Sequence, residues 1–206
     1  MLKSATGRLK PSRPPHYRML ALLRHRALHT LRFQEDPILH KVCHKVKNIK
    51  SPIVQEINNS LDRIVKEEEG VGLAAPQIGE QLCIFTMMRF SDQENATYDT
   101  IINPKIISKS TSDIAFDFEG CLSIPGVVAV VPRHNVIKVE YQDYHTSLKK
   151  TETLSGVEAR IFQHEFDHLN GILFLQHAIP NSFLNEHSYK NLTMEDYEAH
   201  VKKFSN

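Results

Sequence analysis

Apolar residues recur at helical spacing in two stretches of the chain. Ser51-Pro52 is typical of a helix start, with Ser as the N-cap and Pro at the first helical position. The apolar positions that follow define one buried face: Ile53, Ile57, Leu61, Ile64 and Val65. Further along, Ser155 and Glu158 fit a capping box that begins a second helix, and Gly171 is expected to end it. One face of this second helix carries Val157, Ile161, His164 and His168.

Short apolar runs separated by turn residues predict strands in the rest of the chain. The expected strands are 81–90, 100–104, 105–107, 127–131, 136–144 and 172–175. A polar loop is expected over 91–100, a Lys-rich turn before the second helix, and a charged terminal helix from Thr193. The stretch 70–79 holds three glycines, two alanines and a proline, which predicts irregular backbone. This order predicts an α+β fold of mostly antiparallel sheets packed around the helix that carries residues 164–168.

The composition is that of a soluble globular protein, because 41% of the 206 residues are hydrophobic and 24% are charged. This length allows one well-packed domain with extensions. No apolar run approaches the roughly 18 residues that a membrane span needs, so no span is expected. The three cysteines, Cys43, Cys83 and Cys121, are too few for a disulfide framework. We therefore expect a reducing compartment and a core position for Cys83.

Positive charge is concentrated at the start of the chain. Residues 1–34 contain eight Lys/Arg and no acid, whereas the remainder contains 17 Lys/Arg and 24 Asp/Glu. A basic, acid-free leader is typical of an organelle transit peptide. We expect residues 1–32 to be such a leader to the mitochondrion, or alternatively to a plastid-type organelle, and residues 33–206 to be the folded domain. A nucleic-acid-binding arm is the competing interpretation, but no aromatic platform accompanies the charges, so no nucleic-acid partner is expected.

The most informative stretch is His164-Glu165-Phe166-Asp167-His168, an H-E-x-x-H pattern. Side chains four residues apart lie one above the other on a helix, so the two imidazoles can bind one metal ion. Glu165 would lie close enough to handle the proton of a water molecule at that metal. Two histidines at this spacing also arise in ordinary long helices, and this chain has 12 histidines.

A metal site needs at least a third protein ligand, and the residues alone leave its identity open. The continuation H-x-x-G-x-x-H fails, because Phe174 stands where the third histidine is required. Glu186 lies at a plausible distance downstream, and Cys121 is an upstream candidate. His40 and His44 form another pair four residues apart, but no acidic residue accompanies them and lysines crowd the segment. We interpret this pair as surface histidines.

Three segments together resemble the signature motifs of a known family: Gly-Val-Gly-Leu-Ala-Ala-Pro-Gln (70–77), Glu-Gly-Cys-Leu-Ser (119–123) and Gln-His-Glu-Phe-Asp-His-Leu-Asn-Gly (163–171). In order and spacing they resemble peptide deformylase, and in particular its eukaryotic organellar, type 1-like members. The resemblance covers roughly residues 33–180. It implies a hydrolase that removes the formyl group from the N-terminal formyl-methionine of nascent polypeptides. The expected partners are N-formylmethionyl peptides and the organellar ribosome.

The resemblance also implies one divalent metal ion bound by Cys121, His164 and His168. One thiolate and two imidazoles suit Fe2+, Zn2+, Ni2+ or Co2+. In the family the metal in the cell is usually Fe2+, and Zn2+ is often found in the purified protein. We therefore expect Fe2+ in the cell.

By the same resemblance, Glu165 is the general base and then the acid for the leaving amine. The Gln77 side-chain amide and the Leu122 backbone N–H are expected to stabilise the oxyanion together with the metal. Gly72 would offer its backbone to the formyl group. The glycine-rich segment would form an edge to which the substrate adds as an extra strand. Substrate-binding residues are expected at Val71, Gly120, Val157, Arg160 and Ile161.

Two positions depart from the family pattern. Many bacterial members have an arginine where this chain has Val128, and the family often has a smaller apolar residue where it has Arg160. The Arg160 guanidinium would either extend out of the methionine pocket or narrow it. Two other functions are compatible with parts of the sequence: a non-catalytic peptide-binding homologue, and a metallopeptidase that uses His164, His168 and Glu186. None of the catalytic positions is altered, which favours the hydrolase.

Overall fold

The structure is a computed structural model that describes residues 29–90 and 97–205. It is an α+β fold with two antiparallel sheets, as the sequence predicts, in the orders β1-β2-β3-β6-β7 and β4-β5-β8. The strands are β1 (Gly72–Ala74), β2 (Ile84–Arg89), β3 (Thr97–Lys109), β4 (Ile114–Cys121), β5 (Ile124–His134), β6 (Val136–Asp143), β7 (Lys149–Ser155) and β8 (Leu184–Asn185). The helices are α2 (Pro52–Glu67), α3 (Gly156–Leu169), α4 (Glu186–Lys190) and α5 (Met194–Phe204), with 3-10 helices η1 (Pro37–His40), η2 (Ala75–Ile78) and η3 (Phe174–Gln176).

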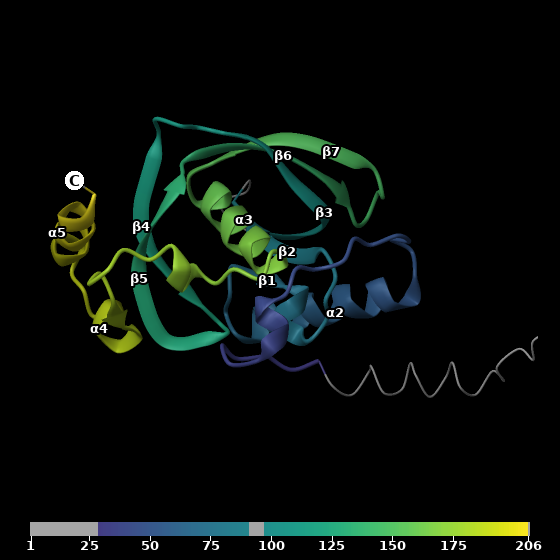
Figure 1. Ribbon diagram of the computed structural model, residues 1–206, viewed down its shortest axis with the longest axis horizontal. Helices are drawn as coiled ribbons and strands as arrows, with labels where there is room; N and C mark the ends of the chain where they lie inside the picture. The colour runs from purple at the N-terminus through teal and green to yellow at the C-terminus, as the bar shows by residue number, and fades with distance from the viewer. Residues whose placement is uncertain (1–28, 91–96, 206) are drawn as a thin grey trace, which may run out of the picture.

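Helix α3 lies at the centre of the molecule, between the two sheets (Figure 1). It packs on one face of the five-stranded sheet, and α2 packs on the other face. Strand alternation explains this division, because Ala74 and Phe85 face α3 whereas Leu73 and Ile84 face α2. Phe85 meets Phe162 of α3 edge to face, with ring centroids 5.1 Å apart. The site helix is therefore anchored in the main apolar core.

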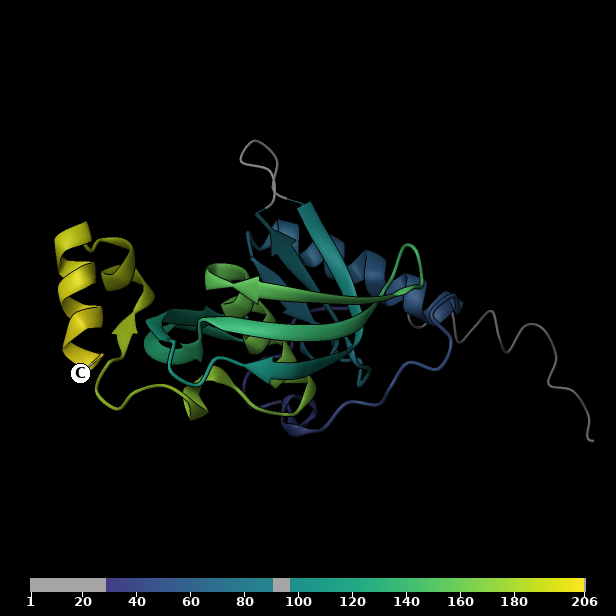
Figure 2. The same ribbon diagram turned by 90° about the horizontal axis from the view of Figure 1, so that it is seen from above.

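Strands β4 and β5 form a hairpin beside α3, and both faces of this hairpin are covered. Alternate residues of a strand point to opposite faces. Glu119 and Cys121 of β4 face α3, while Phe118 packs with Val128 and Val130 of β5 under the C-terminal helices. Helices α4 and α5 cover this second face at one end of the molecule (Figures 1 and 2). The hairpin therefore connects α3 to the C-terminal segment.

Both helices predicted from apolar spacing are present. In α2, Val54 is buried where the half-buried Ile53 was expected, and the other predicted positions are buried as expected: Ile57, Leu61, Ile64 and Val65. Gly171 follows the C-cap of α3 with φ +72°, a conformation that glycine adopts without strain. The terminal helix starts as predicted at Thr193, whose side chain accepts a hydrogen bond from the Asp196 N–H.

The capping box predicted at the start of α3 is wrong. Ser155 is the N-cap residue, but its side chain makes no capping hydrogen bond. Glu158 is bound instead by residues distant in sequence: its Oε1 accepts the Phe90 N–H at 2.8 Å, and its Oε2 lies 3.3 Å from Arg89 Nη1. A half-buried arginine and the Phe90 backbone N–H thus outcompete the local partner.

Pairing extends several strands beyond their apolar runs. β3 is one strand with register shifts after Ile102 and Ile106, where two short strands and a loop up to residue 100 were expected. β7 forms where a Lys-rich turn was expected, because its backbone pairs with β6 along its whole length. Strands β2, β5 and β6 lie where the runs at 81–90, 127–131 and 136–144 predict them. The part of the expected loop over 91–96 lies outside the described residues.

Two short segments have a conformation different from the predicted one. The stretch 70–79 was expected to be irregular, yet it contains β1 and η2, and residues 72–78 are all buried. Its small side chains let the backbone pass between α2 and α3, where pairing with β2 makes it regular. The strand predicted at 172–175 is absent from the described structure, where η3 begins at Phe174.

Cys83 packs half-buried against the core, close to the core position expected for it. Among the described helices, none is long and apolar enough to cross a membrane.

Folded structure is described from residue 29, so the predicted boundary at residue 33 falls inside a packed segment. Leu31 packs against the α2 layer. The Arg32 N–H donates to the Gln77 carbonyl at 2.8 Å, and the Gln34 N–H donates to the Ser123 carbonyl at 3.0 Å. We call residues 29–34 the N-terminal strap, because they connect residues 70–79 to residues 119–123. The rest of the expected leader lies outside the described residues.

Removal of the N-terminal strap is expected to destabilise the domain. A protein that lacks residues 1–34 loses both backbone hydrogen bonds and the Leu31 contact, whereas one that lacks residues 1–28 keeps them. Each such hydrogen bond contributes about 1 kcal/mol, so the free energy of unfolding should fall by at least about 2 kcal/mol. Urea unfolding of the two truncated proteins measures this difference. Equal unfolding midpoints would show that the strap does not stabilise the fold.

Candidate active site

Three side chains that favour transition metals meet between β4 and α3. The ligand atoms of Cys121, His164 and His168 all lie within 4.8 Å of one another. Cys121 Sγ is 3.3 Å from His168 Nε2, and the two imidazole centroids are 5.1 Å apart. Within the described residues, no other His, Cys, Asp or Glu side chains form such a group of three. The structure therefore brings together the three ligands that the family resemblance implies.

Local structure explains why these side chains converge. His164 and His168 are one turn apart on α3 and share the face toward β4. Cys121 is the last residue of β4, two positions after Glu119, so both side chains leave the same face of the strand. The pairing of β4 with β5 shifts register between Gly120 and Cys121, which is the kind of irregularity that bends a strand.

The buried carboxylate of Glu119 orients the first histidine. His164 Nδ1 lies 2.9 Å from Glu119 Oε2. With the proton of the neutral ring on Nδ1, His164 donates to Glu119 and its Nε2 is left for a metal. A carboxylate behind a histidine in this way fixes both the tautomer and the ring orientation of a metal ligand.

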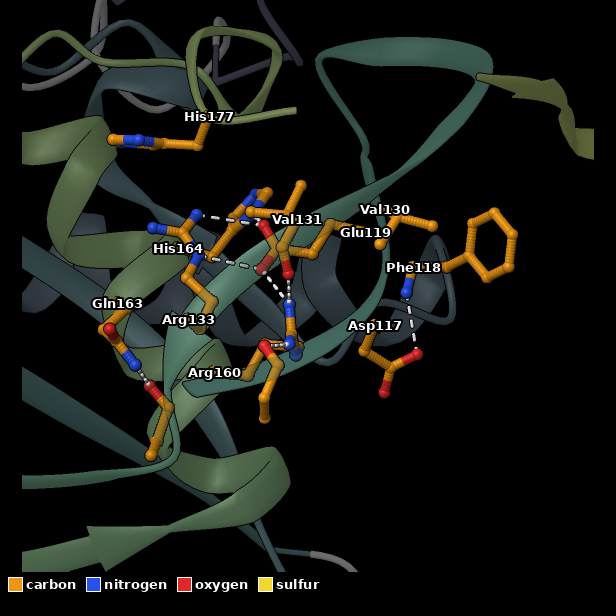
Figure 3. A network of polar contacts seen from close by, with 12 residues as sticks. Asp117, Phe118, Glu119, Val130, Val131, Arg133, Arg160, Gln163, His164 and His177 are labelled. Carbon is orange, nitrogen blue, oxygen red and sulfur yellow. Dashed lines mark hydrogen bonds and ion pairs between the residues drawn. The ribbon is translucent and has the colours of Figure 1, made fainter. Parts of the chain in front are cut away.

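Two arginines complete the surroundings of Glu119 (Figure 3). Arg133 donates to both carboxylate oxygens, from Nε at 2.9 Å and from Nη2 at 3.0 Å, and its Nη1 donates to Asp167 at 2.5 Å. Arg160 Nη1 donates to Glu119 Oε1 at 2.8 Å. Each oxygen of Glu119 thus has two partners, one of which is always Arg133.

These partners keep Glu119 ionised in spite of its burial. Burial by itself raises the pKa of a carboxyl group, but the hydrogen bonds from His164 and Arg133 lower the pKa of Glu119 far below its usual range. Burial lowers the pKa of Arg133, yet its bond to Glu119 raises that pKa above the usual value. Glu119 and Arg133 are each only 6% exposed, so they form a buried ion pair with its hydrogen-bonding groups occupied.

The two histidines are in different electrostatic settings. Burial, followed by the charges of His164 and Arg133, holds the pKa of His168 well below its usual value, so its imidazole is neutral. Burial also acts to lower the pKa of His164, but hydrogen bonds to Cys121 and Glu119 raise it well above the usual value. Neutral imidazole is the form that binds a metal, so a cation among the three ligand atoms would compete with a proton for His164.

Glu165 is adjacent to His164 on α3, and one of its carboxylate oxygens is buried without a partner among the described residues. It is 3% exposed, and its Oε2 has no hydrogen-bond partner within the described part of the chain. Burial raises the pKa of Glu165 from 4.5 to about 7, against the opposing charge of His164. A Cβ atom on Gly72 would lie 2.4 Å from Glu165 Oε1, so β1 can approach this closely only because the residue is glycine. The site therefore contains a carboxyl group that can exchange a proton near neutral pH.

Gln77, the last residue of the 70–77 motif, is held beside Cys121 of the 119–123 motif. Its Oε1 accepts the Ala74 N–H at 2.8 Å. Its Nε2 donates to Ser123 Oγ at 3.2 Å and lies 3.5 Å from Cys121 Sγ. Leu122 follows Cys121 in the turn between β4 and β5, and its side chain packs against the α2 layer. Gln77 thus has an amide N–H group directed at the metal-ligand group.

The five residues expected to bind substrate lie in different settings. Val71 and Val157 are 47% and 55% exposed, which is unusual for valine and leaves both side chains open to a ligand. Gly120 is also exposed, at the end of β4. Ile161 is only 5% exposed and belongs to the core around Phe85. Arg160 directs its guanidinium to Glu119, so only its aliphatic stem is left to line a pocket.

The C-terminal helices explain the departure from the family pattern at Val128. This residue is 6% exposed and packs with Phe118 and Val130 in the cluster beneath α4 and α5. An arginine at this position would place a charge in that apolar cluster, which is costly without a partner.

The alternative third ligand lies in another part of the structure. Glu186 is on α4, which packs on the side of the β4–β5 hairpin that faces away from α3 (Figures 1 and 2). Its carboxylate pairs with Lys190 at 2.6 Å. His40 and His44 are exposed, as predicted. The metallopeptidase arrangement is therefore not the one that the structure contains.

Sequence reasoning missed the polar residues behind the ligands. Glu119, Arg133 and Asp167 carry the network, yet none was assigned a role. One signal was available: two-residue alternation along β4 places Glu119 on the same face as Cys121. The partners of Glu119 come from another strand and from α3, and no local pattern relates these residues to one another.

Comparisons with known proteins agree with this geometry. Residues 29–183 match the family model for polypeptide deformylase. Peptide deformylase 2 of Nostoc sp. is 37% identical over 173 residues, which cover 82% of this chain and 92% of the relative. The chloroplastic peptide deformylase 1A of Solanum lycopersicum is 36% identical over 164 residues, which cover 72% of this chain and 58% of the relative.

A solved structure supports the same assignment. The Met-Ala-Ser-bound crystal structure of class I type b peptide deformylase from Acinetobacter baumannii has a TM-score of 0.66 and 28% sequence identity to this chain. The match covers 73% of this chain and 98% of the other. The matched family region includes Cys121, His164 and His168. The chain therefore belongs to the polypeptide deformylase family, as an enzyme that deformylates nascent peptides.

Proposed function

We propose that this protein hydrolyses the formyl group of N-terminal formyl-methionine on polypeptides newly made in an organelle. The observation that carries this proposal is the buried Glu165 beside the group of Cys121, His164 and His168. In the reaction, water attacks the formyl carbon, the carbon–nitrogen bond breaks, and formate and a free amine are released. The chemistry needs a group that first accepts a proton and later donates one.

A divalent metal ion fits the residues of the site. One thiol and two imidazoles converge within 4.8 Å, and Glu119 orients one imidazole from behind. When bound, the ion would polarise the formyl carbonyl and lower the pKa of a water molecule. We propose Fe2+ as the metal in the cell, as is usual in the family. The sulfur and nitrogen ligands alone do not select it, because they also suit Zn2+, Ni2+ or Co2+.

Glu165 would carry the proton. In the ionised form it takes a proton from the attacking water, and in the protonated form it gives that proton to the leaving amine. Burial, which raises the pKa of Glu165 above its usual value, favours a group that can both take and give a proton near neutral pH. The unpartnered Oε2 is the atom available for this work.

Gln77 and Leu122 would stabilise the oxyanion that forms on the formyl group. The Gln77 amide is held in place by Ala74 and Ser123, so its N–H group needs no reorganisation during the reaction. The Leu122 backbone N–H follows Cys121 directly. Fixed donors of this kind are typically worth about 3 kcal/mol each.

The peptide would add to the free edge of β1. β1 is the outer strand of its sheet, and the Val71 carbonyl accepts the Met88 N–H at 2.7 Å. In an antiparallel pair, hydrogen-bonded positions alternate, so the next pair toward β2 is Leu73 with Thr86. The backbone N–H and carbonyl of Gly72 therefore point to the open edge, where a formylated peptide could bind them as an extra strand.

The methionine side chain would lie near the start of α3. We propose that Val71, Val157, Ile161 and the stem of Arg160 contact it, and that Gly120 leaves room for the peptide backbone on the hairpin side. Val71 and Val157 are exposed apolar residues, and Ile161 offers an apolar wall. Glycine at position 120 has the space for this approach, because a Cβ there would meet only Val128 within close range.

The setting of the reaction is proposed to be the mitochondrion. The basic, acid-free composition of residues 1–34 supports import into an organelle, and a chloroplastic relative makes a plastid-type organelle the alternative. The formylated substrate would come from the organellar ribosome, which is thus a proposed partner. A non-catalytic peptide-binding role has less support, because none of the proposed catalytic positions is altered.

Replacement of Glu165 by glutamine should abolish most of the activity. Glutamine keeps the shape of the side chain but cannot carry the proton, and a general acid–base group typically contributes about 100- to 10,000-fold. The measurement is formate release from a formyl-Met tripeptide by protein that lacks residues 1–28 and is loaded anaerobically with Fe2+. Metal content of the variant must match that of the parent. Undiminished formate release by E165Q would exclude Glu165 as the proton carrier.

Replacement of Cys121 by alanine should remove the metal, whereas replacement of Glu186 should not. The first change deletes one of three proposed ligand atoms, and the second changes a half-exposed side chain that pairs with Lys190. Zinc content after dialysis, measured by atomic absorption, should fall from stoichiometric to near zero in C121A and stay unchanged in E186A. The reverse pattern would restore the metallopeptidase interpretation.

Protein stripped of metal should show a pH effect from Glu165. The folded-state pKa of about 7 lies above the usual 4.5, so between these values the folded chain holds a proton that the unfolded chain has released. Stability from this group is therefore present at low pH and lost as the pH rises toward 7. At about 1.4 kcal/mol per pKa unit the upper limit is about 3 kcal/mol.

The E165Q variant isolates this contribution, because every other titratable group is the same in both proteins. Urea unfolding of the metal-free parent and variant at about pH 5 and about pH 8 gives the comparison. The parent should lose stability relative to E165Q between the two conditions. An identical pH dependence in both proteins would mean that Glu165 does not have a raised pKa.

A further inference from the structure

We propose that Arg160 is a positioning residue that acts on the metal site through Glu119, in addition to any contact of its stem with substrate. This inference rests on the proposed function only for the presence of a metal at Cys121, His164 and His168. Arg160 is one helical turn before His164 on α3, so both side chains point toward the same part of the hairpin. The two residues bind opposite oxygens of one carboxylate.

The contacts to Glu119 show what Arg160 does there (Figure 3). Arg160 Nη1 is 2.8 Å from Oε1, and His164 Nδ1 is 2.9 Å from Oε2. Arg133 donates once to each oxygen. Without Arg160, Oε1 would keep only Arg133 as a donor, and the carboxylate would be held by the hairpin without a direct contact to the turn of α3 that precedes His164. A small shift of the carboxylate relative to α3 would weaken the bond to His164 that sets the orientation of this ligand.

Two further N–H groups of Arg160 donate to the backbone of the hairpin. Nη1 also donates to the Val131 carbonyl of β5 at 2.9 Å, and Nη2 donates to the Ala115 carbonyl of β4 at 2.8 Å. The side chain is 12% exposed. The guanidinium thus binds α3 to both strands of the hairpin that carries Glu119 and Cys121.

These contacts require the planar fork of an arginine. A lysine ammonium group can replace the charge beside Glu119, but it is a compact point charge and cannot reach all three acceptors in the same geometry. Partners of a metal ligand typically contribute 10- to 100-fold to metal affinity, and a loss of about this size is expected when Arg160 is replaced. R160K should fall between the parent and R160I.

The test measures Co2+ binding in the absence of substrate, so it does not depend on deformylation. The proteins are the parent, R160K, R160I, E119Q and the double variant R160I/E119Q. R63L is the matched control, because Arg63 is an exposed arginine that pairs with Glu67 on α2. Competition with a chelator gives the Co2+ dissociation constant, and the visible absorption of bound Co2+ reports the ligand geometry.

The expected result is a Co2+ affinity about 10- to 100-fold weaker in R160I, with a changed absorption spectrum. R63L should match the parent. Because Arg160 acts through Glu119, its replacement should cost little further affinity once Glu119 is already glutamine, so the two losses should not add. In formate release, kcat should fall while KM changes less than about twofold.

Three outcomes would overturn the proposal. Unchanged Co2+ affinity in R160I with a raised KM would make the guanidinium a substrate contact. Fully additive losses in the double variant would show that Arg160 acts independently of Glu119. An unchanged Co2+ spectrum and affinity in R160K and R160I, together with lower urea midpoints of the metal-free proteins, would reduce Arg160 to a stabiliser of the hairpin. If R160I does not fold, R160K alone still tests the proposal, because its Co2+ affinity and its urea unfolding midpoint are separate measurements.

Discussion

The ionised Glu119 carboxylate, enclosed between the β4–β5 hairpin and α3, is the interaction on which the site depends. A charge buried this deeply costs free energy unless its oxygens are bound by donors. Arg133, Arg160 and His164 supply those donors, and each of them would in turn be costly to bury alone. The network is therefore formed as a whole, and this mutual requirement holds β4 and α3 together around Cys121, His164 and His168.

The central place of α3 adds precision to that arrangement. One side of the helix carries His164 and His168, while Phe162 on another side packs against Phe85 in the five-stranded sheet. A site that stands on a helix anchored in a dense core is held more exactly than a site on loops. β1 is also held close to α3, because a Cβ atom on Gly72 would lie only 2.4 Å from Glu165 Oε1. Three elements thus meet with little freedom to move.

Local signals in the sequence were sufficient for both long helices, for the strands at β2, β5 and β6, and for the residues of the three motifs. Apolar spacing located α2, Gly171 marked the end of α3, and the three motifs singled out Cys121, His164 and His168, which the structure brings together. Features decided by distant partners could not be found in this way. Glu158 binds Arg89 and Phe90 instead of capping its own helix, β7 is a strand because β6 pairs with it, and the network around Glu119 joins residues with no common periodicity.

The two covered faces of the hairpin have a consequence for the C-terminal segment. Cys121 and Glu119 face α3, and Phe118, Val128 and Val130 on the reverse face are covered by α4 and α5. These helices lie beyond the residues matched by the family model, which end at 183, and they contain none of the three motifs. They nevertheless pack against the reverse face of β4, the strand that carries Cys121. A fusion partner or label that displaces these helices would therefore act on the strand that carries Cys121, although none of the three motifs lies in this segment.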